Sequence, residues 1–322
     1  MNQRFFSPNS FWNQPIPADA AVDPDNERIV ADMAKRWGPL HINCEKFAMP
    51  VYEVNERTPR IRVRQRGPRP GVAGAMLERE QRYRQHPDFA ASEVPIPDYA
   101  RPDPADDAHI ALVDRSRGLG WDMWRARQCE DGGWESSTGM VYDLNGDGIW
   151  ATSDFPVRDG ESIHFHGPSR AAGVPIIAGL IMEWELRAGR IEHKLAFAGA
   201  TRLQHFCWPA AWTDGACDEG TPMQGQALQL DPSLDLEAFG LSPAGLCIAR
   251  ALQEYGAVAV DGALGNVIYA EGLRNQPGRS WAGLLDPWDL RKIPPTRYRW
   301  LACDRITKAG DTFWRHWKSS GQ

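Results

Sequence analysis

Histidines gather in one part of the chain, together with an arginine. Of the eight histidines in 322 residues, four are His164, His166, His193 and His205. His164 and His166 stand two apart, so a strand would place both imidazoles on one face. Such a pair can begin a metal site of the cupin kind, but further ligands do not follow at cupin spacing. Arg170 comes just after, and together with His166 it can neutralise a substrate carboxylate.

His193 has the chemistry of a general base. It lies on a predicted strand, Ile191–Phe197, and an imidazole titrates near neutral pH. A hydrogen-bonded histidine at the edge of the core is the alternative interpretation. We expect His193 and His166 to line one cleft, where one moves a proton and the other balances charge. Lys194 faces the opposite side of this strand, either toward substrate or as a solvated surface charge.

Two carboxylates stand close together in the sequence EWE. Glu183 and Glu185 share a face if this stretch is extended, and paired carboxylates supply the acid and base of a glycosidase. Residues two apart on one strand rarely flank a sugar bond well, and Glu183–Leu186 can instead form a short helix. We therefore assign the pair to substrate binding.

Aromatic and polar residues cluster in the segment HFCWPAAWTD. His205, Trp208, Trp212 and Asp214 have the composition of a sugar subsite, because indole rings stack on the apolar faces of sugars. A structural Trp-Pro corner is the alternative. The chain has 14 tryptophans, more than a core of this size needs. The surplus favours a surface that binds carbohydrate.

An acidic loop has the spacing of a calcium site. Asp143, Asn145 and Asp147 alternate, Gly148 follows, and Asp154 stands at the distal position. A hard cation takes oxygen ligands in this order, with glycine at the sharp bend. Aspartate replaces the usual glutamate at the last position, which weakens or reshapes the site. We expect structural Ca²⁺ here, and a polar β turn is the alternative.

The hydrophobic pattern predicts a mainly β fold, a β-sandwich of jelly-roll type with a few short helices. A meander is expected from IALVD through WDMWRA to MVYDL, with further strands at IEHKLAFA, LQHFCWPA and ALQLD. VAVDG and NVIYAE are expected to form a hairpin around Gly262–Gly265. Gly and Pro total 55 residues, which suits a chain that turns often.

Two segments carry helix signals, and we expect them to belong to one domain that spans residues 1–322. Asp25 is expected to cap a helix at Asn26–Trp37, and Ser242 is expected to cap another at Pro243–Tyr255 that Gly256 terminates. Residues 1–107 are expected to form an arm, a helix and a long excursion around the core. Residues 108–305 are expected to form the β core.

Charge and hydropathy narrow the class of partner. A net charge of −6 argues against nucleic acid and against an anionic membrane surface. The longest apolar stretch, Gly173–Met182, is too short to span a bilayer, and no signal peptide is visible. Six cysteines permit disulfides, and Cys207 with Cys217 can close a short loop, while free buried thiols are equally consistent.

Several motifs resemble those of a widespread bacterial family of mostly secreted β-sandwich proteins associated with polysaccharide breakdown. The similarity lies in SFWNQPIPADAAVDPD near the start, and later in GVPIIAGLIMEWELRAGRIEHKLAFA, CWPA, PMQG and ALQEYGAVAVDG. It covers roughly residues 7–30 and 109–300, and the segment Asp143–His166 is an insertion relative to the family pattern. The resemblance implies a secreted or periplasmic location and a polysaccharide or oligosaccharide partner.

These observations favour a polysaccharide lyase that cleaves a uronic-acid glycan by β-elimination. That reaction needs a cation beside the carboxylate and a side chain that moves the proton, which His166, Arg170 and His193 can supply. A glycoside hydrolase is the next enzyme class. A non-catalytic carbohydrate-binding or cell-surface module is the alternative of a different class, because the tryptophans alone would account for it.

Overall fold

The computed structural model describes residues 4–150 and 169–308. Within these ranges strands form several sheets and helices are few, so the expected mainly β fold is confirmed. The sheets contain parallel as well as antiparallel pairs. The finer expectation of a jelly-roll sandwich is not confirmed by this topology. In the described part of the chain no helix is long and apolar enough to cross a membrane.

The two longest helices lie where the sequence predicts them. Helix α1 spans Asn26–Trp37, and helix α5 spans Pro243–Glu254, one residue shorter than expected. Ser242 caps α5, because its Oγ accepts a hydrogen bond from the backbone nitrogen of Gly245 at 3.1 Å. Gly256 follows α5 with a φ of 73°, a conformation that glycine adopts without strain.

The remaining helices are short, and one expectation about capping is wrong. Asp25 stands at the N-cap of α1 but makes no cap hydrogen bond, since its carboxylate pairs with Arg28 at 2.7 Å. The short helices are η1 Phe11–Asn13, α2 Gly74–Glu80, α3 Pro87–Ala91, α4 Glu183–Ala188, η3 Leu236–Phe239, η4 Asp289–Lys292 and η5 Pro295–Arg297.

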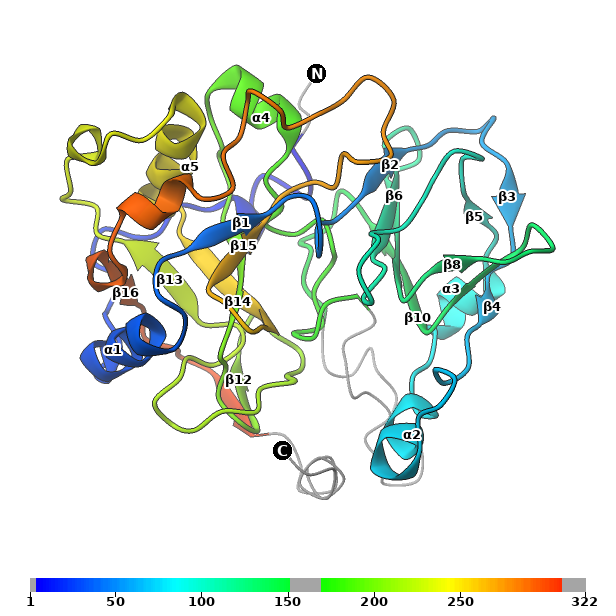
Figure 1. The fold of residues 1–322 in the computed structure, drawn as a ribbon, viewed down its shortest axis with the longest axis horizontal. Helices are drawn as coiled ribbons and strands as arrows, with labels where there is room; N and C mark the ends of the chain where they lie inside the picture. The colour runs from blue at the N-terminus through cyan, green and yellow to red at the C-terminus, as the bar shows by residue number, and fades with distance from the viewer. Residues whose placement is uncertain (1–3, 151–168, 309–322) are drawn as a thin grey trace.

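A six-stranded sheet forms one half of the molecule, on the left of Figure 1. Its strands in spatial order are β1 His41–Asn43, β15 Val267–Tyr269, β11 Leu195–Gly199, β14 Ala257–Gly262, β13 Ala227–Leu230 and β16 Tyr298–Trp300. Leu195 and Phe197 belong to the core cluster that includes α1 and α5, whereas Ala196 and Ala198 belong to a second cluster on the other face. The sheet is therefore buried on both faces.

The expected hairpin of β14 and β15 is wrong. Strand β11 lies between them, parallel to β14 and antiparallel to β15. Every residue of β11 is buried, so this apolar strand occupies the centre of the sheet and separates the two strands that follow it in sequence. The segment around Gly262–Gly265 therefore crosses over β11 and does not form a tight turn.

A four-stranded sheet forms the other half, on the right of Figure 1. Its order is β10 Thr138–Asp143, β7 Leu119–Trp124, β6 Ile110–Asp114 and β2 Val51–Glu53. The antiparallel run β6-β7-β10 is the expected meander, and β2 joins it in parallel to β6. Because β1 and β2 belong to different sheets, the N-terminal region contributes strands to both halves as well as wrapping around them.

Three small sheets complete the described strands. They pair β3 Arg60–Ile61 with β5 Val94–Pro95, β12 His205–Cys207 with β17 Ile306–Lys308, and β4 Arg64–Gln65 with β9 Trp134–Ser136 and β8 Arg127–Gln128. The long excursion of residues 67–107 carries α2, α3 and β5, and Phe89 of α3 is buried with the core of the four-stranded sheet.

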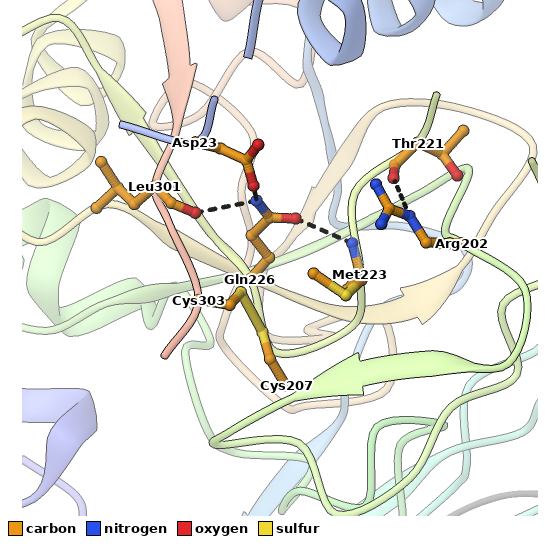
Figure 2. The surroundings of a disulfide bond; sticks show 8 residues. All are labelled: Asp23, Arg202, Cys207, Thr221, Met223, Gln226, Leu301 and Cys303. Atoms are coloured by element: carbon orange, nitrogen blue, oxygen red, sulfur yellow. Dashed lines mark hydrogen bonds between the residues drawn. A yellow bond between two sulfur atoms is a disulfide. The ribbon is translucent and has the colours of Figure 1, made fainter. Parts of the chain in front are cut away.

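A disulfide joins Cys207 at the end of β12 to Cys303, which follows β16 (Figure 2). The alternative pairing of Cys207 with Cys217 is wrong. The backbone nitrogen of Cys217 donates to Thr201 at 2.9 Å, whereas the pairing of β12 with β17 brings the C-terminal strand alongside Cys207. Gln226 reinforces this region, since its amide donates to Asp23 at 2.7 Å and to the Leu301 carbonyl at 2.9 Å.

Candidate functional site

A polar cavity of about 270 Å³ is lined by residues from both halves of the molecule. His109 precedes β6, and Trp124 and Arg125 stand at the end of β7, where the antiparallel pairing brings these two strand ends together. Asp261 at the end of β14 and Tyr269 at the end of β15 line the opposite side. We refer to this cavity as the His109 cavity.

His109 combines burial with a ring nitrogen that is itself buried and has no hydrogen-bond partner among the described residues. Its ring bonds to the backbone of Ser169, and Nδ1 has no hydrogen-bond partner within residues 4–150 and 169–308. Burial lowers the pKa of His109, and the positive charge of Arg170 lowers it further, against the opposing carboxylates of Asp107 and Asp261. The imidazole is therefore neutral at neutral pH, which is the state of a general base.

Arg170, predicted to bind a substrate carboxylate, is instead an internal counter-ion. Its side chain is fully buried, and Nη1 donates to Asp261 at 2.9 Å. The guanidinium carbon lies 4.3 Å from the centre of the Tyr269 ring, and Nη2 donates to the Ile176 carbonyl. Arg170 is not among the residues that line the cavity. Arg170 therefore contacts two residues of the cavity wall, Asp261 and Tyr269, without lining the cavity itself.

Asp261 and Tyr269 both retain protons more strongly than usual. Burial raises the pKa of Asp261, although Arg170 and His109 oppose the change. Burial, with the charge of Asp261, raises the pKa of Tyr269 well above its ordinary value, so its hydroxyl stays protonated. The cavity therefore places a neutral imidazole and a proton-bearing phenol on its walls.

Two arginines supply positive charge on the same cavity. Arg69 Nε and Arg125 Nη1 both pair with the Glu80 carboxylate, at 2.6 Å and 3.1 Å. Burial opposes ionisation of Glu80, yet the arginines hold its pKa below the ordinary value. The arginines are a local positive group, because the lining also carries Asp106, Asp107, Asp214 and Asp261, and its carboxylates outnumber its guanidiniums. Arg69 is 45% exposed and accessible to a ligand.

Of the sequence-predicted residues, Asp214 lines the His109 cavity. It accepts hydrogen bonds from the backbone of Gly262 at 3.1 Å and from the side chain of Gln224. Trp212 is buried behind it and packs with Tyr83, which meets Trp124 edge to face at 4.8 Å. Tyr83 and Trp124 give the cavity an aromatic wall.

His193 lies elsewhere, and the strand predicted to carry it begins only at Leu195. Its Nε2 bonds to Glu185 Oε1 at 2.9 Å and its Nδ1 approaches the Lys194 carbonyl at 2.8 Å. Burial alone would lower the pKa of His193, but the Glu185 carboxylate raises it. His193 precedes β11, whereas Asp261 pairs with Ala198 near the far end of that strand. The structure therefore does not bring His193 and Arg170 together.

Glu183 and Glu185 occupy the first turn of α4, the helical alternative for this stretch. Glu183 pairs with Arg187 at 2.8 Å and with Arg279 at 2.7 Å. Glu185 accepts from the backbone of Met182 at 3.0 Å as well as contacting His193. Because both carboxylates are engaged in structural contacts, they do not form an acid and base pair around a sugar bond.

The segment HFCWPAAWTD divides between two places. Asp214 reaches the His109 cavity, whereas Trp208 lines a separate groove that also contains Lys194. His205 begins β12, and its Nδ1 lies 2.9 Å from the Leu203 carbonyl. A single subsite built from all four predicted residues is therefore wrong.

The predicted calcium loop is described only in part. Asp143 accepts from the backbone of Asn145 at 2.8 Å, and Asp147 accepts from Ile149 at 3.0 Å. Across the described ranges no group of three or more His, Cys, Asp and Glu side chains is placed to hold a metal ion. Asp154, His164 and His166 lie outside the described residues, so their assignments stay predictions.

Sequence reasoning missed His109, Tyr269, Asp261 and the arginine pair. His109, Asp261, Tyr269 and Arg125 stand in or beside predicted strands, whereas Arg69 lies in the excursion of residues 67–107, where the sequence offers no such signal. Comparison with protein-family models, curated proteins and solved structures finds no match to this chain. The function of the cavity must therefore be argued from its own chemistry.

Proposed function

We propose that this protein is a polysaccharide lyase that acts on a uronic-acid-containing glycan within the His109 cavity. The observation that carries the proposal is the juxtaposition of a neutral buried histidine, a proton-bearing tyrosine and an arginine pair. β-Elimination needs these three functions: a base, a proton donor and a cation for the carboxylate.

Each residue has a defined role in the proposed reaction. Arg69 and Arg125 bind the uronate carboxylate and make the adjacent C5 proton more acidic. The imidazole of His109 removes that proton, a C4–C5 double bond forms, and the C4–O glycosidic bond breaks. The Tyr269 hydroxyl donates a proton to the departing oxygen. Tyr83 and Trp124 pack against the sugar rings.

The proposal includes the cellular location of the protein and its membership of the wider class of carbohydrate-active proteins. A disulfide between Cys207 and Cys303 is typical of an oxidising compartment, which supports a secreted or periplasmic protein. The mainly β fold and the family resemblance are consistent with a carbohydrate-active protein of sandwich type. Structural Ca²⁺ at Asp143, Asn145 and Asp147 also remains part of the proposal.

A glycoside hydrolase is the second candidate, favoured by one observation. Asp214 and Asp261 both line the His109 cavity, and the pKa of Asp261 is raised, as in a general acid. In that reaction Asp261 would donate the proton and Asp214 would act as nucleophile or base. The ion pair of Asp261 with Arg170 favours the carboxylate form of Asp261 and therefore opposes this role.

A panel of polyuronates and neutral polysaccharides separates the candidates. A lyase produces unsaturated ends that absorb in the ultraviolet, and we expect this signal on a polyuronate. Reducing ends without ultraviolet absorbance indicate the hydrolase and contradict the lyase. Binding without any product indicates a carbohydrate-binding module. The Tyr269→Phe variant should reduce the ultraviolet signal while keeping the melting temperature of the parent within a few degrees.

A further inference from the structure

A second cavity, of about 460 Å³, lies apart from the His109 cavity and shares no lining residue with it. Phe11 and the segment 14–17 form one side, and Trp208, Cys303 and Arg305 form another. Lys194 also lines it. We refer to this cavity as the Trp208 groove.

Lys194 is the unusual residue of this groove. It is only 4% exposed, yet no carboxylate lies within ion-pair distance of its ammonium in the part of the chain that the structure describes. Its Nζ donates to the Gln14 carbonyl and lies 4.6 Å from the centre of the Phe11 ring. A buried ammonium normally pairs with an anion, so this group lacks the counter-ion that its burial demands.

Trp208 adds an apolar surface to the same groove. Its indole is 40% exposed, although large aromatic side chains usually bury most of their surface. Phe11 meets it edge to face at 4.7 Å, and the Arg305 guanidinium lies 4.6 Å from its ring centre. The groove therefore presents an exposed indole with the Arg305 guanidinium against its ring, while Lys194 contacts the neighbouring Phe11 ring.

The charges in the groove sum to a positive value. Lys194 and Arg305 are its two cations, and Asp304 is its one anion among the described lining residues. The surplus of one positive charge matches a ligand with a single negative charge. An indole in a groove that also contains two cations suits a ring with an apolar face and a carboxylate at its edge.

We propose that the Trp208 groove is a binding site for a single uronic-acid unit, independent of chemistry in the His109 cavity. The sugar carboxylate lies between Lys194 and Arg305, and the apolar face of the pyranose packs on the Trp208 indole. The site binds and does not react, so its occupancy does not depend on turnover. A second sugar site of this kind would hold a polyuronate chain on the protein.

Calorimetric titration with sodium D-glucuronate tests the proposal, with D-glucose and sodium acetate as reference ligands. We expect glucuronate to bind at least about tenfold more tightly than either reference, because only glucuronate offers both the ring and the carboxylate. Equal affinity for glucose and glucuronate would overturn the role of the cations. Equal affinity for acetate and glucuronate would overturn the role of the indole.

Two variants and two matched controls locate the binding. Trp208→Ala and Lys194→Met should each weaken glucuronate binding about tenfold or more. Trp288 is the matched tryptophan, because it is 49% exposed, carries Arg291 at 4.6 Å and lines neither cavity. Trp288→Ala and Lys35→Met, which changes an exposed lysine, should leave the affinity unchanged. Unchanged binding in Trp208→Ala overturns the proposal even if Lys194→Met fails to fold.

The His109→Gln variant separates this site from the proposed active site. If glucuronate binding persists in His109→Gln and disappears in Trp208→Ala, the groove is the binding site whatever reaction the protein performs. If the loss occurs in His109→Gln alone, the sugar binds in the His109 cavity and the groove proposal fails. A lyase assay on the Trp208→Ala variant then reports on the function proposal separately.

Discussion

Several ionisable side chains in or beside the strands are buried, and burial disfavours the charged form of each. Burial raises the pKa of Asp122 to about 6, even though its carboxylate accepts hydrogen bonds from Ile176 and Tyr142. The same cause lowers the pKa of Lys194 to about 8. Burial therefore shifts the pKa of Asp122 and of Lys194 away from the pKa of an exposed aspartate or lysine.

His109→Gln should reduce turnover on a polyuronate by about 10²–10⁴-fold, the usual effect of removing a general base. Because His109 must be neutral to accept a proton and its pKa is lowered, the wild-type rate should rise with pH along a limb centred below about 6.5. Initial rates between pH 4 and 8 measure both effects.

The control for this variant is His205→Gln, a partly exposed histidine outside the cavity. It should keep full activity. An active, folded His109→Gln protein would exclude His109 from the mechanism, and an acid limb centred well above 6.5 would exclude it as the free base.

His193 and Glu185 should stabilise the fold in a pH-dependent way. The pKa of His193 is raised in the folded state, so its stabilising contribution is fully present below about 6.5 and is lost as pH rises through the folded value. His193→Gln should therefore lower the melting temperature more at pH 5.5 than at pH 9. Glu185→Gln should show the same trend, because it removes the carboxylate that causes the shift. A pH-independent loss in both variants would contradict this account.

A local sequence pattern predicts a helix or strand correctly when the residues that interact lie within that same element. Helix α5 begins at Pro243 because Ser242 caps it, whereas Asp25 stands at the start of α1 without making a cap bond. The hairpin of β14 and β15 was predicted from an equally local signal and is wrong, because β11 binds to both strands from a distance in sequence. The boundaries of α1 and α5 follow local rules here, whereas the start of β11 and the partners of the strands do not.

The caps of α1 and α5 give a direct comparison. Ser242→Ala should lower the free energy of unfolding by about 1 kcal/mol, because the Gly245 nitrogen loses its acceptor. Asp25→Ala removes only a partly exposed ion pair and should cost less than about 0.5 kcal/mol. Urea denaturation of both variants measures the difference, and an equal loss would contradict it.

Calcium should raise the melting temperature if the loop at Asp143 binds it. We expect millimolar Ca²⁺ to stabilise the wild type and chelator to reverse the effect. The double variant Asp143→Asn and Asp147→Asn should show neither change, because it removes two charged ligands. A wild-type melting temperature that is insensitive to both treatments would leave the loop as a polar turn.

The whole molecule depends on contacts between distant parts of the chain. The N-terminal region supplies strands to both large sheets, and Gln226 connects Asp23 to Leu301 across the structure (Figure 2). The disulfide links residues 96 positions apart. The His109 cavity exists only because the two halves meet, so its integrity follows the stability of the entire fold.

Removal of the disulfide should therefore destabilise the whole protein. Cys303→Ser should lower the free energy of unfolding by about 2–5 kcal/mol, because a long loop in the unfolded chain is no longer closed. Cys217→Ser is the control and should change the free energy by less than about 1 kcal/mol. A reductant should lower the melting temperature of the wild type but not that of Cys303→Ser. A wild-type melting temperature that is insensitive to reductant would contradict the link.

The sequence by itself determined the mainly β class, the meander and the positions of α1 and α5, because alternation, periodicity and capping act between near neighbours. The sequence also named Asp214, Trp208 and Lys194 as candidate site residues, and the binding role of each stays a prediction. Only the tertiary structure decided that His109, Asp261 and Tyr269 share a cavity. Asp261 and Tyr269 stand on β14 and β15, which both pair with β11, whereas His109 precedes β6 of the other large sheet. Arg170 changed from a substrate ligand to a buried counter-ion for the same reason. Burial and charge partners depend on packing between distant segments, and no local pattern encodes them.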